Sequence, residues 1–430
     1  MSSGGLIRGD DGTLRLCGAP LEALLQAAGV DTPAYVYDLD AIAASARALV
    51  AALGDRGVCC YAIKANDAAP IARVIIREGC GIDVVSGGEL RVALACGAKP
   101  DQIVYSGVAK RDDEIDLALS TGIRAIHAES VEEVDRIAAR ARALRLRDAS
   151  IGLRVNPSVE ADTHAHIATG HDEAKFGIAR DDVPRALDAI RASSGALRLV
   201  SMSSHVGSML MTTDPYVEAL RVLVEVVREV QARGFTLRYV DAGGGFGVPY
   251  RDDQQAVPGP AFVTAARRTL DEAGLADLAL LIEPGRWLVA AHGVLLTRVI
   301  QPKRSNAGGV ARRWLLVDAG MNDLIRPALY QAHHRIVPVD APASAPAGSV
   351  VVPWRVAGPV CESSDDFGEH PLPDPPPSLL AIREAGAYGR SMASTYNTRP
   401  IAAEVFVSGG AVVSVRRARA IDALVADETT

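Results

Sequence analysis

Short apolar runs alternate with longer amphipathic segments through the middle of the chain. The runs are a few residues long and close on polar residues, as buried parallel strands do. They predict strands over Tyr61–Lys64, Ile82–Ser86, Ile103–Ser106, Ala125–Glu129, Ile151–Asn156, Leu199–His205, Tyr239–Gly243 and Leu278–Glu283. Helical spacing predicts helices over Pro70–Glu78, Gly88–Cys96, Asp112–Ser120, Val131–Leu144, Asp182–Ala192, Pro215–Arg233 and Pro260–Ala273. This alternation predicts an α/β fold, a parallel (β/α)8 TIM-type barrel.

The pattern changes after the barrel, where alternating β-rich segments replace the long helices. These segments are Val289–Arg298, Arg313–Asp318, Ser349–Val356 and Ala402–Val415. They predict a mainly antiparallel β domain, to which the N-terminal residues add a strand. The expected domains are therefore a barrel over 34–286 and a β domain built from 1–33 and 287–430. The proline cluster Pro371–Pro377 is predicted to be a loop, because proline cannot donate a hydrogen bond inside a central strand.

Composition supports a folded protein of two domains and argues against nucleic acid and membranes as its partners. The chain has 430 residues, of which 49% are hydrophobic, and a formal net charge of −7. An acidic chain has no general attraction for nucleic acid or an anionic membrane. No signal-like N-terminus and no apolar run of about 18 residues occurs, so we expect no membrane association. The six cysteines form no CxxC pair, which predicts no metal site and a reducing, cytoplasmic location.

Two charged residues lie at the carboxyl ends of predicted strands, which is where the active site of such a barrel is found. Lys64 closes the first strand, and its amine could form a Schiff base with an aldehyde cofactor. Glu283 closes the eighth strand and could pair with a protonated pyridine nitrogen. Each residue alone also fits an ordinary role, Lys64 as a lysine that reaches water and Glu283 as half of a salt bridge.

Two further strand ends carry groups that suit a phosphorylated ring. The turn Gly243–Gly247 follows the seventh strand and could present backbone N–H groups to a phosphate. His205 closes the sixth strand and could lie flat on a ring, with Ser208 near the phosphate. A tight turn and a buried core histidine are the ordinary alternatives. Together, an amine, a flat aromatic ring, an anion-binding turn and a carboxylate are the groups that pyridoxal 5'-phosphate needs.

Longer strings resemble a known family. The barrel strings Tyr61–Asn66, Asp83–Leu90, Lys175–Gly177, His205–Ser208, the glycine turn and Glu283–Arg286 resemble the fold-type III pyridoxal-phosphate decarboxylases, whose barrel is like that of alanine racemase. The strings Asp318–Tyr330, Gly358–Asp365 and Gly386–Asn397 narrow the resemblance to the diaminopimelate decarboxylases. The match extends from about residue 33 to 408. The chain departs from the pattern at Met209, where glutamine is more usual, and at His127, where asparagine is common.

The resemblance implies a role for individual residues. The implied catalytic residues are Lys64, which carries the cofactor, Cys361, which donates a proton, His205, which stacks on the ring, and Glu283. The implied cofactor-binding residues are Lys64, Asp83, His205, Ser208, Gly244, Gly245, Glu283, Gly285, Arg286 and Tyr388. The implied substrate-binding residues are Arg286, Arg326, Tyr330, Glu362 and Tyr388. In this family a homodimer completes each active site, so Cys361 and Glu362 would reach the partner's cofactor.

The activity implied is α-decarboxylation of meso-2,6-diaminopimelate to L-lysine and CO₂, the last step of lysine biosynthesis. A related decarboxylase acting on ornithine, lysine, arginine or a carboxy-polyamine is the nearest alternative. Arg326 and Tyr330 argue against it, because a cation there suits a second substrate carboxylate. A racemase would favour arginine in the place of Glu283. A non-catalytic carrier of the cofactor would lack the C-terminal β domain.

Overall fold

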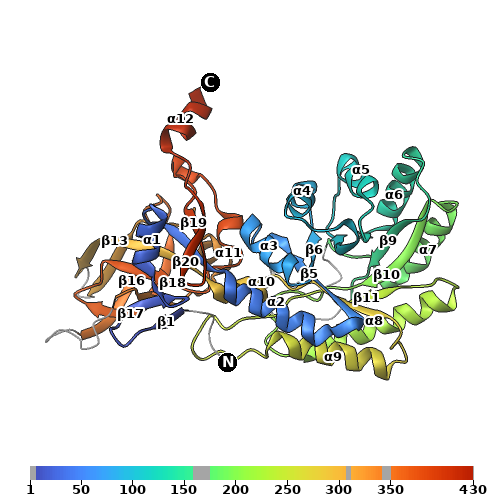
Figure 1. The fold of residues 1–430 in the computed structure, drawn as a ribbon, viewed down its shortest axis with the longest axis horizontal. Helices are drawn as coiled ribbons and strands as arrows, with labels where there is room; N and C mark the ends of the chain where they lie inside the picture. Colours follow the sequence, from blue (N-terminus) through green and yellow to red (C-terminus); the bar gives the residue numbers. More distant parts are fainter. Residues whose placement is uncertain (1–5, 158–174, 307–310, 341–349, 430) are drawn as a thin grey trace. The chain divides into compact units, whose positions relative to one another are not determined.

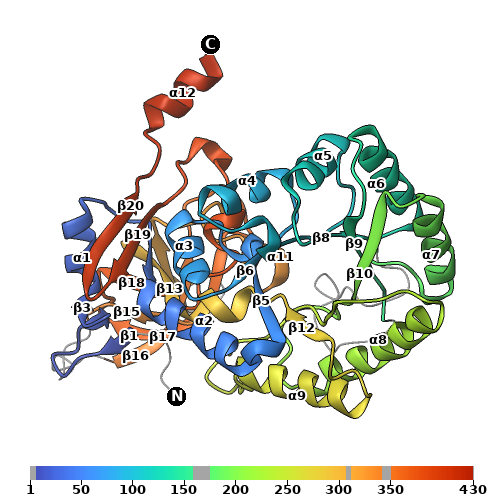
Figure 2. The same cartoon turned by 45° about the vertical axis from the view of Figure 1, so that its right-hand side comes forward.

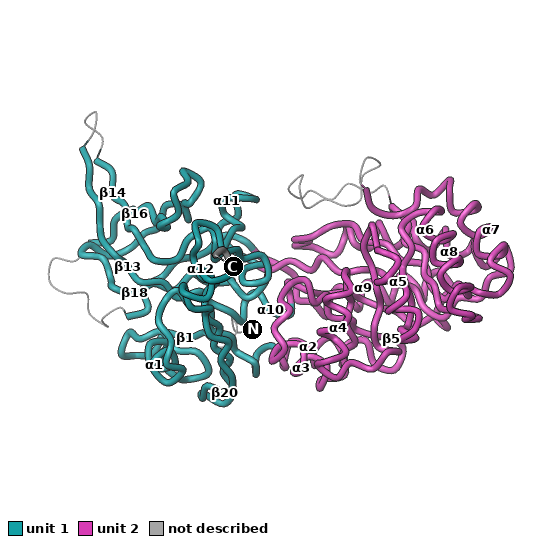
Figure 3. The backbone as a smooth tube through the Cα atoms, turned by 90° about the horizontal axis from the view of Figure 1, so that it is seen from above, with its two compact units in different colours: residues 1–42, 249–254, 288–430 teal, residues 43–248, 255–287 magenta. Residues whose placement is uncertain are grey.

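The computed structural model describes residues 6–157, 175–306, 311–340 and 350–429, drawn in Figure 1. The chain divides into two compact units, shown in Figure 3. The barrel unit comprises residues 43–248 and 255–287. The β unit comprises residues 1–42, 249–254 and 288–430, so a short segment after the seventh barrel strand belongs to it.

The barrel unit contains a closed parallel barrel of eight described strands, which confirms the predicted fold class. Each neighbouring pair is parallel, and the last strand pairs with the first. The strands are β5 (Gly57–Ala62), β6 (Gly81–Val84), β7 (Ile103–Tyr105), β8 (Ala125–Ala128), β9 (Ala149–Arg154), β10 (Leu197–Ser203), β11 (Tyr239–Asp241) and β12 (Ala279–Ile282). Every predicted barrel strand is therefore present. Apolar side chains such as Val104, Val200 and Leu281 gather in a buried cluster of these strands.

Helices surround the barrel strands, as Figure 2 shows. They are α2 (Leu39–Leu53), α3 (Ala69–Arg77), α4 (Gly87–Ala95), α5 (Asp112–Thr121), α6 (Val131–Ala143), α7 (Val183–Ala192), α8 (Asp214–Ala232) and α9 (Gly259–Glu272). The short helix α10 (Arg286–Val289) follows β12. Helices α4 and α6 begin after a serine whose hydroxyl accepts a hydrogen bond from a backbone N–H of the first turn, Ser86 from Glu89 and Ser130 from Glu133, each at 3.1 Å. Such caps satisfy donors that a helix leaves free and so define where it begins.

The β unit is built on a nine-stranded sheet. Its strands are β4 (Ala34–Asp38), β13 (Gly293–Ser305), β14 (Arg312–Val317), β15 (Ile336–Pro338), β16 (Val350–Ala357), β17 (Asp366–Asp374), β18 (Leu379–Ile382), β19 (Ala403–Ser408) and β20 (Ala411–Arg416). Most pairs are antiparallel, but β14 pairs with β16, and β4 with β19, in parallel. Strand β4, which the expected range 34–286 includes, thus lies in this sheet. Ser349, the first residue of one predicted strand, lies outside the described residues.

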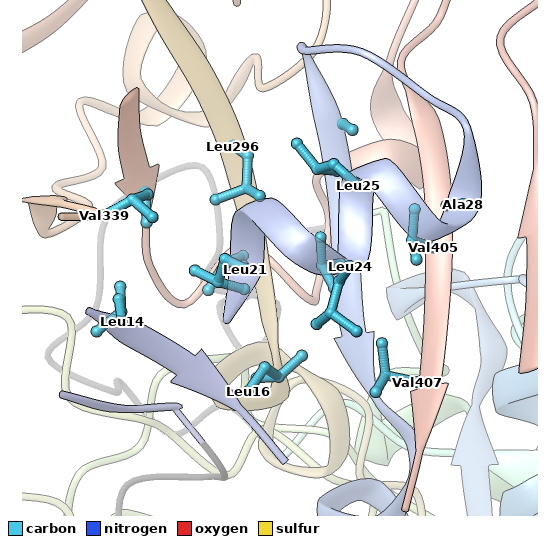
Figure 4. Close-up of a cluster of buried hydrophobic side chains, with 14 of the residues drawn as sticks. Leu14, Leu16, Leu21, Leu24, Leu25, Ala28, Leu296, Val339, Val405 and Val407 are labelled. Carbon is cyan, nitrogen blue, oxygen red and sulfur yellow. The ribbon is translucent and has the colours of Figure 1, made fainter. Parts of the chain in front are cut away.

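The N-terminal residues join the β unit through a small sheet of their own instead of an added strand. Strands β1 (Leu6–Arg8), β2 (Leu14–Leu16) and β3 (Ala19–Pro20) form this sheet, and α1 (Leu21–Ala28) follows. The N–H of Leu14 donates to the carbonyl of Val339 at 2.8 Å. A shared hydrophobic core holds the N-terminal segment on the large sheet (Figure 4). Leucines of β2 and α1 pack there with residues of the sheet, including Leu296, Val405 and Val407.

The prediction of a loop over the whole proline cluster is wrong. Pro371 and Pro373 lie within β17, which pairs antiparallel with β16. Strand β17 stands at one end of the strand order. An edge strand tolerates proline because alternate N–H groups face away from its single neighbour and need no partner. Two short helices, α11 (Arg326–Tyr330) and α12 (Ile421–Thr429), complete this unit. No described helix has the length and apolar character needed to cross a membrane.

Candidate active site

Lys64 and Asp83 form an ion pair where the first two barrel strands end. Strand β5 ends at Ala62, so Lys64 lies in a tight turn (Ile63–Ala65) after the strand instead of closing it. Its Nζ is 3.3 Å from Asp83 Oδ2; 40% of the lysine side chain is exposed, whereas the aspartate side chain is fully buried. The other oxygen of Asp83, Oδ1, is buried without a hydrogen-bond partner among the described residues. The pair thus offers an accessible amine beside a carboxylate with spare acceptor capacity.

Glu283 follows β12 and lies above a buried polar group. Ser106 Oγ donates to Glu283 Oε1 at 3.2 Å and is 3.3 Å from His127 Nδ1. Asp241 Oδ2 is 3.6 Å from the same His127 nitrogen. Ligand atoms of Glu283, Asp241 and His127 all lie within 4.8 Å of one another. Residues from β8 and β11, with Ser106 directly after β7, therefore converge beneath one carboxylate.

Burial controls protonation in this group. It raises the pKa of Glu283 to about 7, with a further increase from the negative charge of Asp83 and an opposing effect of Lys64. Burial and the charge of Glu283 raise the pKa of Asp241 well above its usual value. Two adjacent buried carboxyl groups do not both ionise readily. We therefore assign the proton to Asp241 and the negative charge to Glu283. Burial lowers the pKa of His127 to about 3, so this imidazole is neutral.

His205 lies against the glycine turn. Its Nδ1 accepts a hydrogen bond from the N–H of Gly244 at 3.2 Å, so this nitrogen carries no proton. Burial, with the positive charges of Arg154 and Lys64, lowers the pKa of His205 well below its usual value. The ring is therefore neutral and held in one orientation, which suits stacking on an aromatic ligand.

The turn after β11 is packed so closely that it requires glycine. A Cβ on Gly244 would overlap the carbonyl oxygen of Glu283, and one on Gly245 would overlap that of Gly207. Gly245 also has a positive φ of +90°, a conformation that other residues rarely adopt. The turn is thus wedged between the loops that follow β10 and β12.

A buried arginine lies beside this turn. Arg286 is 6% exposed, and its Nη2 donates to Ser208 Oγ at 3.1 Å. A Cβ added to Gly285, the residue before it, would lie within 3.2 Å of Ala62 and Ala65, so this position is also closely packed. A hydroxyl and a guanidinium are groups that bind a phosphate.

Sequence reasoning missed the second ionic centre of the rim, Glu129 with Arg154. Arg154 Nη1 is 2.9 Å from Glu129 Oε1. Glu129 also accepts hydrogen bonds from the N–H groups of Gly107 and Gly177, each at 2.9 Å. Glu129 follows β8 as Glu283 follows β12, so the strand-end rule could have found it. Ser106, His127 and Asp241 beneath Glu283 were likewise not expected in the site.

The remaining expected residues lie in the β unit. Arg326 begins α11 and is only 4% exposed; Tyr330, at the end of the same helix, is half-buried. Arg326 Nη1 is 2.7 Å from His334 Nε2, and its guanidinium lies 4.6 Å from the centre of the Tyr250 ring. Tyr388 is half-buried and has a positive φ of 55°.

Cys361 and Glu362 are exposed on a loop of the β unit. The N–H of Cys361 donates to Asn397 Oδ1 at 3.2 Å, and Tyr396 Oη donates to Glu362 Oε1 at 2.7 Å. Asp365 anchors this loop by accepting from the N–H groups of Val360 and Met321, both at 2.6 Å. The expected residues of the barrel unit thus meet at one rim. In the β unit, Arg326 and Tyr330 lie on α11, whereas Cys361 and Glu362 lie on a loop.

Comparison with known proteins identifies the family. Residues 39–290 match the family described as "Pyridoxal-dependent decarboxylase, pyridoxal binding domain". A diaminopimelate decarboxylase of Pseudomonas aeruginosa is 41% identical over 400 residues, which are 93% of each chain. The chain belongs to the diaminopimelate decarboxylase family.

Solved structures agree with this membership. A diaminopimelate decarboxylase from Helicobacter pylori, complexed with L-lysine, superposes with a TM-score of 0.85 at 36% identity, covering 95% of this chain and 100% of that one. Another from M. jannaschii, also with L-lysine, has a TM-score of 0.88 at 32% identity, covering 100% and 98%. The described chain is thus a pyridoxal-dependent decarboxylase in sequence and in fold.

The residues at the rim fit the cofactor that the family name implies. An accessible amine at Lys64, a carboxylate at Glu283 and an anion-binding group at the glycine turn are the three attachments that a phosphorylated pyridine aldehyde requires. Glu283, Asp241 and His127 also have the spacing of three metal ligands, as do Cys17, Asp38 and Asp40. In the second group Asp38 accepts from the N–H of Ala41 at 2.8 Å, an ordinary role at the start of α2.

Proposed function

We propose that this chain, with pyridoxal 5'-phosphate held at Lys64, decarboxylates meso-2,6-diaminopimelate to L-lysine and CO₂, the last step of lysine biosynthesis. The observation that carries the proposal is the meeting of Lys64, Asp83 and Glu283 at one barrel rim. The names of the relatives support the substrate, and two solved relatives are described with L-lysine bound.

Ten residues would hold the cofactor: Lys64, Asp83, His205, Ser208, Gly244, Gly245, Glu283, Gly285, Arg286 and Tyr388. When bound, the cofactor supplies a cationic ring that accepts the electron pair left by departing CO₂. Glu283, ionised because Asp241 keeps the shared proton, would hold a proton on the ring nitrogen. His205 would cover one face of the ring and exclude water from it.

The β unit would supply the groups that bind substrate and return a proton. Substrate carboxylates would be bound by arginines, Arg286 and Arg326, with Tyr330 and Tyr388 beside them. Glu362 would accept the ammonium group of the distal centre. The exposed thiol of Cys361 would donate the proton that replaces CO₂.

We also propose that the enzyme works as a homodimer in the cytoplasm. Cys361 and Glu362 are exposed in the single chain, which suits residues that complete a partner's site. The three buried cysteines Cys59, Cys60 and Cys80 are free thiols, as a reducing compartment favours.

Product identification tests the proposal. Purified enzyme loaded with pyridoxal 5'-phosphate is incubated separately with meso-diaminopimelate, L-ornithine and L-lysine, and amine products and CO₂ are measured. We expect L-lysine and CO₂ from diaminopimelate alone. Lys64→Ala should lose the absorbance of the bound cofactor and nearly all turnover. Release of CO₂ from ornithine at a comparable rate, or full activity of Lys64→Ala, would contradict the proposal.

A further inference from the structure

A histidine that the proposed chemistry does not use makes a close polar contact with Arg326. His334 is 1% exposed, and its Nε2 is 2.7 Å from Arg326 Nη1. Its other ring nitrogen, Nδ1, is 2.9 Å from the carbonyl oxygen of Arg383. One buried imidazole therefore connects the guanidinium to the backbone after β18.

The partners of His334 determine its protonation. A guanidinium can only donate hydrogen bonds, so Nε2 must be the acceptor. A carbonyl oxygen can only accept, so Nδ1 must carry the proton. His334 is therefore a neutral imidazole with a defined tautomer. A neutral acceptor orients Arg326 without cancelling its positive charge.

The neighbouring arginine shows the alternative arrangement. Arg335 is ion-paired with Glu384 and, at 3.0 Å, with Asp252. Those carboxylates balance its charge inside the β unit, which suits a structural role. The contact of Arg326 with His334 differs, because a neutral imidazole accepts the hydrogen bond there and contributes no negative charge.

An aromatic ring supports the same guanidinium. The guanidinium carbon of Arg326 lies over the Tyr250 ring, 4.6 Å from the ring centre. The Tyr250 and His334 rings meet edge to face, with their centres 5.1 Å apart. Tyr250 belongs to the segment 249–254 that leaves the barrel sequence and joins the β unit. A cation over an aromatic face retains its charge, so Tyr250, like His334, supports Arg326 without neutralising it.

We infer that His334, with Tyr250, is a positioning residue that presents Arg326 to the distal carboxylate of the substrate and so determines selectivity for a substrate with two carboxylates. The inference rests on the proposed function. It gives a reason why this arginine would bind a carboxylate well: charge-assisted hydrogen bonds require a fixed guanidinium plane.

Ligand binding separates this role from a general structural one. L-Lysine keeps the distal carboxylate, whereas 1,5-diaminopentane has the same carbon chain and no carboxylate. Both are titrated by calorimetry into cofactor-loaded enzyme, and KM and kcat for diaminopimelate are measured alongside. The variants are His334→Phe, which keeps an aromatic ring but neither hydrogen bond, and His334→Gln, whose amide offers one acceptor and one donor.

We expect His334→Phe to weaken L-lysine binding and raise KM about tenfold, the effect of losing one hydrogen bond to a charged group, with kcat within about twofold. Binding of 1,5-diaminopentane should stay unchanged, and His334→Gln should restore most of the L-lysine affinity. The control His333→Phe alters the adjacent histidine, which stacks on His370, and should behave as wild type. If His334→Phe does not fold, His334→Asn, whose amide is too short to reach both partners, replaces it.

The outcomes distinguish the inference from the proposed function. Unchanged L-lysine binding in His334→Phe, or equal weakening of L-lysine and 1,5-diaminopentane, would overturn the inference while the activity stands. Absence of CO₂ release from diaminopimelate by the unmodified enzyme would overturn the proposed function and, with it, the substrate assigned to Arg326.

Discussion

Burial, more than the chemical type of the side chain, determines the protonation state of individual residues at the rim. Glu283 and Asp241 are both carboxylic acids, yet the first is assigned the charge and the second the proton because their surroundings differ. His127 and His205 are both neutral for the same reason, loss of water. Both protonation states can be tested by unfolding protein that has been freed of cofactor.

Replacing Glu283 by glutamine should change how stability depends on pH. Folding raises the pKa of Glu283 from 4.5 to about 7, so the folded state binds the proton more tightly. The resulting stabilisation is complete below pH 4.5 and is lost as pH rises through 7. Between about pH 5 and pH 8, the free energy of unfolding of wild type, measured with urea, should therefore fall by up to ~3 kcal/mol more than that of Glu283→Gln. Parallel curves for the two proteins would contradict the raised pKa.

Replacing His127 by asparagine should act on the acid side with the opposite sign. Folding lowers the pKa of His127 from 6.5 to about 3, so the unfolded chain binds the proton more tightly. The stabilisation is present above pH 6.5 and is lost as pH falls toward 3. Urea unfolding at about pH 7 and pH 4.5 should show a smaller acid-induced loss in His127→Asn than in wild type. An equal loss would mean that His127 is not buried as a neutral group.

At the scale of elements, the loops after β10, β11 and β12 pack against one another and share backbone hydrogen bonds. The N–H of Glu283 donates to the carbonyl of Gly243 at 2.8 Å, and that of Leu210 donates to Gly245 at 2.9 Å. The turn therefore connects the group around His205 with the group around Glu283. Adding a side chain inside it should disturb both neighbours and the proposed phosphate site together.

A pair of glycine variants tests this. Gly245 and Gly234 have similar positive φ values of +90° and +85°, but a Cβ at Gly234 has nothing within 4 Å. Gly234→Ala should cost only about 1 kcal/mol of conformational strain and leave cofactor affinity intact. Gly245→Ala should cost more and weaken cofactor binding at least tenfold, because its Cβ overlaps a backbone carbonyl. Thermal unfolding and titration with pyridoxal 5'-phosphate measure both effects; identical behaviour would contradict the tight packing.

At the scale of the whole molecule, the proposed homodimer predicts complementation. Mixing inactive Lys64→Ala with slow Cys361→Ala and allowing subunits to exchange gives heterodimers with one intact site. Random exchange should then restore about a quarter of wild-type activity. Lys64→Ala mixed with Glu283→Gln is the control, because both changes affect the barrel and no intact site can form. Failure of the first mixture to gain activity, with exchange verified, would mean that Cys361 acts within its own chain.

The sequence by itself determined the barrel and the order of its chemical groups. Strand and helix periods are local, so each of the eight barrel strands could be located within a few residues. Parallel barrel strands place their carboxyl ends at one rim, so the sequence alone assigns Lys64, His205 and Glu283 to one site. The expected places of these residues needed only small changes, such as the turn that carries Lys64 beyond β5.

Tertiary structure alone decided which residues meet from distant parts of the chain. His127 and Asp241, from β8 and β11, come together beneath Glu283 with Ser106, which follows β7. Tyr250 and His334 meet at Arg326. Proline in β17 was acceptable only because that strand became an edge. The hydrophobic periodicity of the sequence indicates whether a residue is buried, but it does not indicate which residue lies against it. That choice depends on long-range packing and on the charge and desolvation of groups brought together by the fold.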